Sequence, residues 1–530
     1  MRAGVAAVAI VVALVAGACS SSDSDSDSAS GSTTQAKKAT STTETSLPVV
    51  VKETPKVTPT DCWWPVPTET SDGKPLTGVT ITCGTVQVPA DRTDAKTKMI
   101  TIPVARIHKT GAPADAVPTV YLHGGPGGDA LVTAPTGLMG LDSLAERDVI
   151  TYDQRGSGRS TPSLNCPEKE EATLDALSAQ KPWAEELATN RKAVQACRDR
   201  LTGDGIDLSV YNTPNSVADM ETIRAAYGVD TWNVWGASYG TRLGLAYARE
   251  HPDQVRSLLI DSVYSPDVGG VERSQSLPVG AIDRLVAACD AQASCKAAYG
   301  DLQEKLDTAI AAFDAKPESV TGTVEVDGKE QTRTLQLTGP DVLAGMFAAL
   351  YDSTIIPSLP GVISGLAAGD RSIIPAFVST GVPRLLDLSE GAFYSTECAD
   401  SGRLLDEKKA AAALKDPGEL SLVALGTAET FCQDWPVTHV PASFNEPVTV
   451  DVPTLVYGGT LDPITPYKES KAQADRMPDA RFVSVPSSGH GAAKFDECTQ
   501  AARDAFWNDP KAELPACTED IKGNEFTVGG

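Results

Sequence analysis

Histidine is scarce in this chain: only five occur among its 530 residues, and no two cysteines have the C-x-x-C spacing. Structural zinc sites take their ligands from closely spaced cysteines and histidines, so this composition argues against zinc. The glycine-rich loop 153–160, which follows a strand-like segment, lacks the spacing of a phosphate-binding P-loop. We therefore expect a protein that holds no metal and needs no cofactor.

Positive charge is also in short supply. The chain carries 45 lysines and arginines against 70 aspartates and glutamates, which gives a formal net charge of −25. Proteins that bind nucleic acids carry clustered positive charge, so this balance argues against a nucleic-acid partner. An acidic surface of this kind keeps a protein soluble.

The apolar run at the start of the chain is short. One basic residue, Arg2, precedes sixteen almost wholly apolar residues that end at Ala18, directly before Cys19. This run is too short to span a membrane and is typical of a signal peptide. A cysteine at the cleavage point predicts lipidation of Cys19 and a tether to the outer face of the cell membrane, the only membrane contact expected. Ala16 stands where such sites usually carry leucine, so plain secretion is the alternative.

Residues 20–60 contain almost no large apolar side chains and are rich in Ser, Thr, Asp, Lys and Pro. Such a composition cannot bury a core, so we expect a disordered stalk.

Ten cysteines remain besides Cys19, an even number in an exported chain, which favours disulfides. Composition does not fix their connectivity, but proximity along the chain suggests five pairs. These are Cys62 with Cys83, Cys166 with Cys197, Cys289 with Cys295, Cys398 with Cys432, and Cys498 with Cys517.

Ser238 lies in the pentapeptide GASYG, between the strand-like segment 231–235 and a helix-like stretch. A sharp strand-to-helix turn that exposes a reactive serine needs small residues two positions before and after it. Gly236 and Gly240 occupy these positions. The pattern is short and could be an ordinary turn, but its flanking strand and helix favour a nucleophile.

A serine hydroxyl needs a histidine base, which in this kind of turn follows the serine and an acid along the chain. Four histidines are unsuitable, because two precede the serine, one ends the serine's own helix and one lies in a loop without a preceding strand: His108, His123, His251 and His439. His490 follows the strand-like segment 481–485 and lies between small residues in SSGHG. We therefore expect His490 to be the base.

Asp462 is the only acid in the loop GGTLDPITP, which follows the strand-like segment 452–457. Catalytic groups collect at the carboxyl ends of parallel strands, where this loop would lie. Asp451 precedes the same strand and would lie at the opposite edge of the sheet. The sequence thus predicts a triad of Ser238, Asp462 and His490.

Acyl transfer also needs N–H donors for the developing oxyanion. The first expected donor is the backbone of Tyr239, directly after the serine. The second is Gly125 in HGGPGG, where glycines follow another short strand and let the main chain approach a substrate. We interpret Asp153 and Arg155 in the neighbouring DQRGSGRS loop as structural residues that pair within that loop.

Taken together, HGGPGG, YDQRGSGRS, WGASYGTRLGLAYAREHP, TLVYGGTLDPITP and SSGHG resemble the prolyl iminopeptidase and tripeptidyl aminopeptidase family of α/β-hydrolase serine exopeptidases. The likeness is greatest to its secreted actinobacterial tripeptidyl aminopeptidase-like branch and extends from about residue 61 to the end. It implies Ser238 as the nucleophile, Asp462 as the acid, His490 as the base and the HGGPGG glycines as the oxyanion loop.

The fold class expected is α/β, namely an α/β-hydrolase with a mostly parallel sheet, helices on both faces and a large, mainly helical lid. Asp462 follows Ser238 by 224 residues (462 − 238), far more than a strand and a helix require. Beyond the segment 258–262 the pattern becomes helix-like. We expect a core at 61–265, a lid at 266–438 and a second part of the core at 439–530. The segment 161–215 is a smaller helical excursion.

The triad predicts hydrolysis through an acyl-serine but does not choose the substrate. Glu397 and Asp400 in YSTECADS resemble the lid region of the family that faces the site, and a lid carboxylate would bind the ammonium of a peptide's free N-terminus. Surface acids without this role are the plain alternative. We expect a monomeric serine aminopeptidase acting on peptides. The rivals are a secreted carboxylesterase or lipase and a binding lipoprotein without activity.

Overall fold

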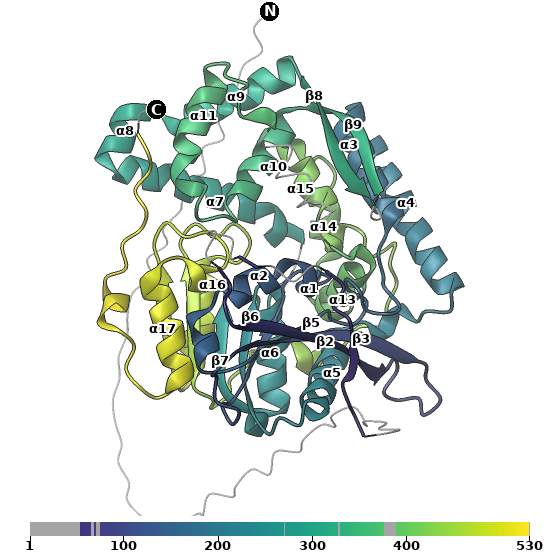
Figure 1. Ribbon diagram of the computed structural model, residues 1–530. Coiled ribbons are helices and arrows are strands. Elements are labelled where there is room, and N and C mark those ends of the chain that lie inside the picture. The colour runs from purple at the N-terminus through teal and green to yellow at the C-terminus, as the bar shows by residue number, and fades with distance from the viewer. Residues whose placement is uncertain are drawn as a thin grey trace, which may run out of the picture. The chain divides into compact units, whose positions relative to one another are not determined.

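The computed structural model of the chain describes residues 54–64, 68–69, 75–269, 271–326, 329–375 and 388–528 (Figure 1). The expected signal peptide 1–19, Cys19 and residues 20–53 of the expected stalk lie outside these ranges. Across the described part of the chain, no helix combines the length and the apolar character needed to cross a membrane.

Nine strands of the described residues form one sheet in the spatial order β1-β2-β3-β5-β4-β6-β7-β10-β11. Their bounds are β1 Thr58–Thr60, β2 Val79–Pro89, β3 Met99–Lys109, β4 Thr119–Leu122, β5 Val149–Tyr152, β6 Trp232–Ala237, β7 Val255–Asp261, β10 Thr454–Gly459 and β11 Ala480–Val485. The strands from β5 to β11 are parallel to one another, and those at the β1 edge are antiparallel. β4, β5 and β10 are buried along their whole length, as expected for parallel strands that helices cover on both faces.

The first strand corrects one expectation. Thr58–Thr60 lie within the segment expected to be a disordered stalk, yet they pair with Cys83–Thr85 of β2. The ordered domain therefore begins before residue 60. Three exposed residues at the edge of a sheet carry no hydrophobic alternation, so the sequence gives no signal for this strand.

Helices cover both faces of the sheet. On one face, α5 (Thr213–Ala226) and α6 (Tyr239–Glu250) share a buried cluster with Val234 of β6. On the other face, α2 (Pro135–Met139) and α17 (Glu497–Asn508) share a cluster with Trp235, whose ring lies 5.4 Å from that of Trp507. Alternate residues of β6 thus enter different layers, as the pleat of a strand requires.

The segment between β7 and β10 forms a second layer beyond the ends of the strands (Figure 1). Its elements are α7 Val271–Ala291, α8 Ala293–Tyr299, α9 Leu302–Ala315, β8 Glu318–Val326, β9 Lys329–Leu337, α10 Gly339–Ala349, α11 Leu359–Ala367, α13 Glu390–Ser401, α14 Glu407–Ala413 and α15 Ser421–Leu425. This layer has a hydrophobic cluster of its own, which includes Leu285, Phe313 and Ile363. It is mainly helical, but β8 and β9 form an antiparallel hairpin that the sequence analysis does not anticipate.

Two elements cross the expected boundary of the lid. The helix α3 (Pro167–Ala179) comes from the earlier excursion, yet its Leu174 and Leu177 belong to the lid's cluster. The helix α13 lies in the lid segment, yet its Tyr394 and Ala399 belong to the cluster of the core. The lid is therefore assembled from two stretches of the sequence.

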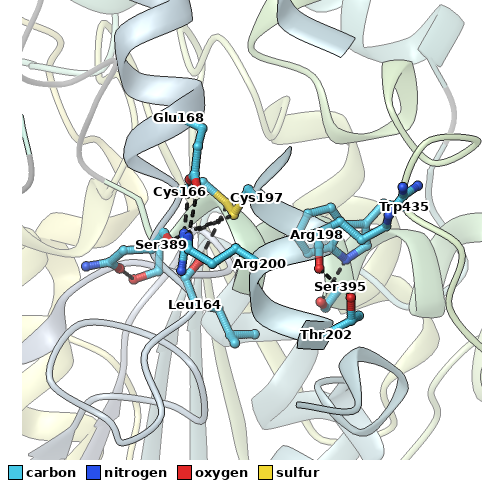
Figure 2. Close-up of a disulfide and its surroundings, with 11 residues drawn as sticks. Leu164, Cys166, Glu168, Cys197, Arg198, Arg200, Thr202, Ser389, Ser395 and Trp435 are labelled. Carbon is cyan, nitrogen blue, oxygen red and sulfur yellow. Dashed lines mark hydrogen bonds and ion pairs between the residues drawn. A yellow bond between two sulfur atoms is a disulfide. The ribbon is translucent and has the colours of Figure 1, made fainter. Parts of the chain in front are cut away.

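All five disulfides expected from proximity are present: Cys62–Cys83, Cys166–Cys197, Cys289–Cys295, Cys398–Cys432 and Cys498–Cys517. Figure 2 shows the bridge that joins α3 to α4 (Trp183–Gly203), beside the ion pair of Arg200 with Glu168. Ser389, the residue before α13, lies in the same view. This bridge fixes the base of the helical excursion next to the start of α13.

Candidate active site

Ser238 lies on the turn between β6 and α6 with a φ of +56°, a conformation that residues other than glycine rarely adopt. The chain can turn this sharply because of the flanking glycines. A Cβ atom on Gly240 would lie far inside van der Waals contact with the carbonyl oxygen of Leu122, and one on Gly236 would meet the carbonyl of Gly240. The turn therefore requires both glycines, and it presents Ser238 at the carboxyl end of β6.

Asp462 follows β10 and His490 follows β11, the two strands that lie beyond β7 at the edge of the sheet. His490 Nδ1 is 2.9 Å from Asp462 Oδ2. Asp462 also accepts hydrogen bonds from the N–H groups of Ile464 and Thr465, at 3.0 and 2.8 Å, and from the Thr465 hydroxyl. These contacts hold the carboxylate and orient the imidazole.

Asp462 is fully buried. Burial alone would raise the pKa of its carboxyl, but the charge and hydrogen bond of His490, together with the Thr465 and Ile464 N–H groups, outweigh it and lower the pKa below its usual value. Asp462 is therefore ionised at neutral pH, where it stabilises a positive charge on His490.

Ser238 and His490 line one cavity of about 550 Å³. No hydrogen bond joins the Ser238 hydroxyl to the imidazole in the part of the chain that the structure describes, and such contacts often tighten only when substrate binds. The ring of Tyr351, from the lid, lies 5.0 Å from that of His490. The lid supplies most of the apolar lining, which includes Ala344, Phe347, Ala348, Tyr351, Leu422 and Val423.

The HGGPGG loop runs along the serine. A Cβ atom on Gly124 would lie 2.7 Å from Ser238 Cβ, so these backbones are in contact, and Gly125 lines the cavity with a φ of +115°. Tyr239 is the first residue of α6, where the N–H groups point away from the helix and the helix dipole favours negative charge. Both expected donors, Tyr239 and Gly125, thus belong to segments that adjoin Ser238.

The lid fixes the outer part of this loop. The N–H of Ser389 donates to the Gly127 carbonyl at 2.9 Å, and Leu388 forms a β-bridge with Gly128. The Ser389 hydroxyl accepts a hydrogen bond from the Gly158 N–H at 3.0 Å and donates one to Asn165 Oδ1. The HGGPGG loop, the expected oxyanion loop, is therefore attached to the residues that precede α13.

The two candidate acids of α13 lie in different surroundings. Glu397 lines the cavity, where its Oε2 accepts from the hydroxyls of Tyr264 at 2.9 Å and Ser401 at 3.3 Å. Asp400 is fully buried, accepts hydrogen bonds from the N–H and hydroxyl of Thr213, and does not line the cavity. Of the two, only Glu397 can reach a molecule bound beside Ser238.

Arg242 of α6 lies between these acids. Its guanidinium is completely buried, 3.7 Å from Glu397 Oε2, and it covers the ring of Tyr264 at 3.7 Å. Burial and the attraction of Arg242 act in opposite senses on Asp400, and burial prevails, which raises the pKa of this carboxyl to about 7. At the wall of the cavity the guanidinium therefore pairs with Glu397, whereas the raised pKa of Asp400 favours its neutral form below about pH 7.

Two further side chains line the cavity: His123, which the sequence excludes as the base, and Lys494, for which the sequence predicts no role. His123 precedes the oxyanion glycines, and burial, with the nearby charges of Lys494 and His490, lowers its pKa to about 4. A neutral His123 fits a site that already contains a basic histidine. Its position in HGGPGG is a signal that could have marked it, whereas nothing in the sequence around Lys494 does so.

The other predicted roles differ in outcome. His251 ends α6 with its ring 5.0 Å from that of Tyr247, and neither it nor His439 lines the cavity. Asp153 is structural, since it accepts from the N–H groups of Leu131 and Arg159. The prediction that Arg155 pairs within its own loop is wrong. Its guanidinium instead pairs with the buried carboxylate of Asp219 on α5.

Comparisons with known proteins agree with the fold. A family model described as "alpha/beta hydrolase fold" matches residues 118–310, and one described as "TAP-like protein" matches residues 423–518. Each model covers a segment that contributes to the cavity. Together they include Ser238, Asp462 and His490.

Among similar curated proteins, the tripeptidyl aminopeptidase of Streptomyces coelicolor is 26% identical over 447 residues, which cover 78% of this chain and 77% of that protein. The serine protease Hip1 of Mycobacterium tuberculosis is 26% identical over 432 residues, or 74% of this chain and 79% of its own length. A solved structure, the proline iminopeptidase of Mycobacterium smegmatis, is 18% identical with a TM-score of 0.40 and covers 80% of this chain and 98% of its own. The chain is therefore a serine hydrolase with the α/β-hydrolase fold, and it is similar to tripeptidyl aminopeptidases and proline iminopeptidases.

Proposed function

We propose that this enzyme is a serine exopeptidase that removes short peptides from free N-termini. The observation that carries the proposal is the carboxylate of Glu397 in the wall of the cavity that contains Ser238. A buried carboxylate beside a nucleophile is a suitable partner for the ammonium group of a peptide's first residue.

The surroundings of Glu397 favour a cation. Its Oε2 already has three partners, the hydroxyls of Tyr264 and Ser401 and the guanidinium of Arg242. Its Oε1 has no hydrogen-bond partner among the described residues. Oε1 is therefore the acceptor to which an ammonium in the cavity would donate a hydrogen bond.

The proposed chemistry uses three residues in sequence. His490 takes the proton of the Ser238 hydroxyl as Oγ attacks the peptide carbonyl, and Asp462 stabilises the imidazolium. The N–H groups of Tyr239 and Gly125 would bind the oxyanion of the tetrahedral intermediate. His490 then gives its proton to the leaving amine, and water releases the acyl group from Ser238 by the same steps in reverse order.

The test compares Ala-Ala-Ala nitroanilide with its N-acetylated form. The wild type should cleave the free peptide at least 10-fold faster, because a charge-assisted hydrogen bond contributes roughly 10- to 100-fold in kcat/KM. Glu397→Gln should lose this preference while it keeps the hydrolysis of 4-nitrophenyl acetate, which has no ammonium. Glu390→Gln, in the first turn of the same helix, is the matched control.

Equal cleavage of the free and acetylated peptides by the wild type would contradict an exopeptidase. In that case a carboxylesterase is the better interpretation, because the apolar lid lining would suit an acyl chain.

We also propose that the enzyme is exported, because its five disulfides favour an oxidising compartment. We further propose that it is a monomer. Whether Cys19 carries a lipid anchor can be measured by metabolic labelling with an azido fatty acid.

A further inference from the structure

Lys494 is the last residue of the 3₁₀ turn Ala492–Lys494, four residues after His490, and it lines the same cavity as Ser238. Its ammonium lies over the rings of Trp235 and Tyr121, 5.2 and 5.8 Å from their centroids. The side chain is open to the cavity although protein atoms surround it closely. Burial lowers its pKa, and the nearby charge of Arg503 lowers it further.

The ammonium of Lys494 has no ion-pair partner among the residues that the structure describes. Asp261 attracts it electrostatically, but the two oxygens of Asp261 accept from the N–H groups of Ala492 and Ala493, at 2.9 and 3.0 Å. Arg503 brings a second positive charge. The donors of Lys494 are thus left for molecules that enter the cavity.

Lys494 and Glu397 approach Ser238 from opposite faces of the sheet. Glu397 belongs to α13, whose Ala399 is buried with Tyr239 and Leu243 of α6. Lys494 adjoins Ala492 and Ala493, which are buried with Trp235 and with Phe506 of α17. The cavity therefore presents the Glu397 carboxylate on the α6 face and the Lys494 ammonium on the α17 face, where Asp261 also lines it. We call the side of the cavity at Lys494 the positive wall.

The proposed chemistry indicates which part of the substrate would lie beside the positive wall. If the N-terminal ammonium binds Glu397, the acyl part of the peptide lies between Glu397 and Ser238. His490 must reach the nitrogen of the leaving group to protonate it. Lys494 lies four residues after His490 and lines the same cavity, so we place it near the scissile bond and the leaving group.

We propose that Lys494 binds a carboxylate of the peptide substrate and so determines specificity. The carboxylate has two sources, an acidic side chain directly before the scissile bond or the terminal carboxylate of a short leaving peptide. The proposal rests on the exopeptidase function above and adds to it a substrate class, peptides that carry a negative charge near the cleaved bond.

The first arm of the test compares the nitroanilides of Ala-Ala-Asp and Ala-Ala-Asn, and the second compares Ala-Ala-Ala-Ala with a free or an amidated C-terminus. In one of these arms, the wild type should prefer the carboxylate by roughly 10- to 100-fold in kcat/KM, as expected for a charge-assisted hydrogen bond. Lys494→Met should abolish that preference and change the neutral substrates less than about 3-fold. Lys494→Arg should restore part of it.

The control variant is Lys471→Met, whose lysine pairs with Asp475 on the surface of α16 (Tyr467–Arg476), and it should keep the wild-type preference. Thermal unfolding of each variant shows whether it is folded. The proposal is overturned if neither arm shows a preference in the wild type, or if Lys494→Met lowers the charged and neutral substrates equally.

The failure of the exopeptidase function gives a different result, namely that the wild type cleaves the free and the N-acetylated Ala-Ala-Ala nitroanilide equally or cleaves neither. Lys494 can then be tested on esters, with 4-nitrophenyl hydrogen glutarate against its methyl ester. A preference for the free acid that Lys494→Met removes would uphold the carboxylate site. Equal rates for the two esters would refute it.

Discussion

Ser238 follows Ala237 and Ser157 follows Gly156, and both lie in short glycine-containing loops, but their surroundings differ. Ser238 lies on a strained turn at the cavity, whereas Ser157 is buried in a loop and does not line the cavity. A fluorophosphonate probe should therefore label the wild type and Ser157→Ala but not Ser238→Ala. Mass spectrometry of the labelled peptide measures this directly, and labelling that survives Ser238→Ala would show that another residue is the nucleophile.

The histidines give a second comparison. His490→Ala should lower kcat by about 10³-fold or more, because the members of a triad act as a unit. His251→Ala should leave kcat nearly unchanged, since its ring packs against Tyr247 at the far end of α6. A loss of equal size in both variants would point to a damaged fold or a wrongly assigned base.

Asp400 makes stability depend on pH. Its carboxyl has a pKa of about 7 in the folded protein, against about 3.9 for an unfolded chain. Between these values the folded state holds a proton that the unfolded state has lost, so the free energy of unfolding falls as the pH rises. The maximum slope is about 1.4 kcal/mol per pH unit.

Asp400→Asn removes this contribution, so its stability should fall less steeply than that of the wild type between pH 4.5 and 7. Urea unfolding followed by tryptophan fluorescence at several pH values measures the slope. Asp475→Asn, on the surface of α16, is the control and should keep the wild-type slope. Identical slopes for Asp400→Asn and the wild type would mean that Asp400 is ionised in the folded protein.

At the scale of residues, sequence reasoning is effective where geometry restricts the amino acid. Ser238 needs glycines on both sides, and Asp462 and His490 each follow an apolar strand, so all three leave a local pattern. Lys494 leaves no such local pattern, because its proposed role depends on the rings of Tyr121 and Trp235, which lie on β4 and β6. Asp400 and Glu397 are three residues apart, and only the packing of α13 shows which one enters the cavity.

At the scale of elements, α13 is the part of the lid with the most connections to the site. It carries Glu397, follows the residues that hold the oxyanion loop, and is joined to residue 432 by the Cys398–Cys432 disulfide. The entropy of the unfolded chain increases more when a bridge that closes a longer loop is removed. The Cys398–Cys432 bridge spans 34 residues and the Cys289–Cys295 bridge only 6.

We therefore expect the double variant Cys398→Ala/Cys432→Ala to lose about 4 kcal/mol of stability, and Cys289→Ala/Cys295→Ala about 2 kcal/mol. Chemical unfolding of both variants under non-oxidising, thiol-free conditions measures the difference. Titration of thiols in the unfolded wild type should find none of the ten paired cysteines free. A larger loss in Cys289→Ala/Cys295→Ala than in Cys398→Ala/Cys432→Ala would contradict the argument from loop length.

The hairpin of β8 and β9 shows why the lid was only partly predictable. Its sequences, ESVTGTVEV and KEQTRTLQL, alternate β-branched and polar residues in the way of half-buried strands. The segments on both sides have helix-like patterns, so the sequence favours a helical structure for the whole region. The parallel strands of the core were easier to predict, because each is a short, continuous apolar run before a glycine-rich loop.

At the scale of the whole molecule, the sheet and the lid are less separate than their order in the sequence implies. The excursion α3 belongs to the cluster of the lid, α13 belongs to that of the core, and both clusters contribute to the walls around Ser238. Contacts between distant segments leave no periodic pattern, so domain boundaries drawn on the sequence alone cannot place them.

The neighbouring strands β7 and β10 have a consequence for how the enzyme folds. They pair side by side, but β7 ends at Asp261 and β10 begins only at Thr454, after the entire lid. Until the last part of the chain arrives, β7 has an unpaired edge, and its Leu258, Leu259 and Ile260 are apolar. An exposed edge of this kind is a template for pairing with other chains. The strands that bring the acid and the base thus also close the sheet, so a chain interrupted before β10 would be both inactive and prone to aggregate.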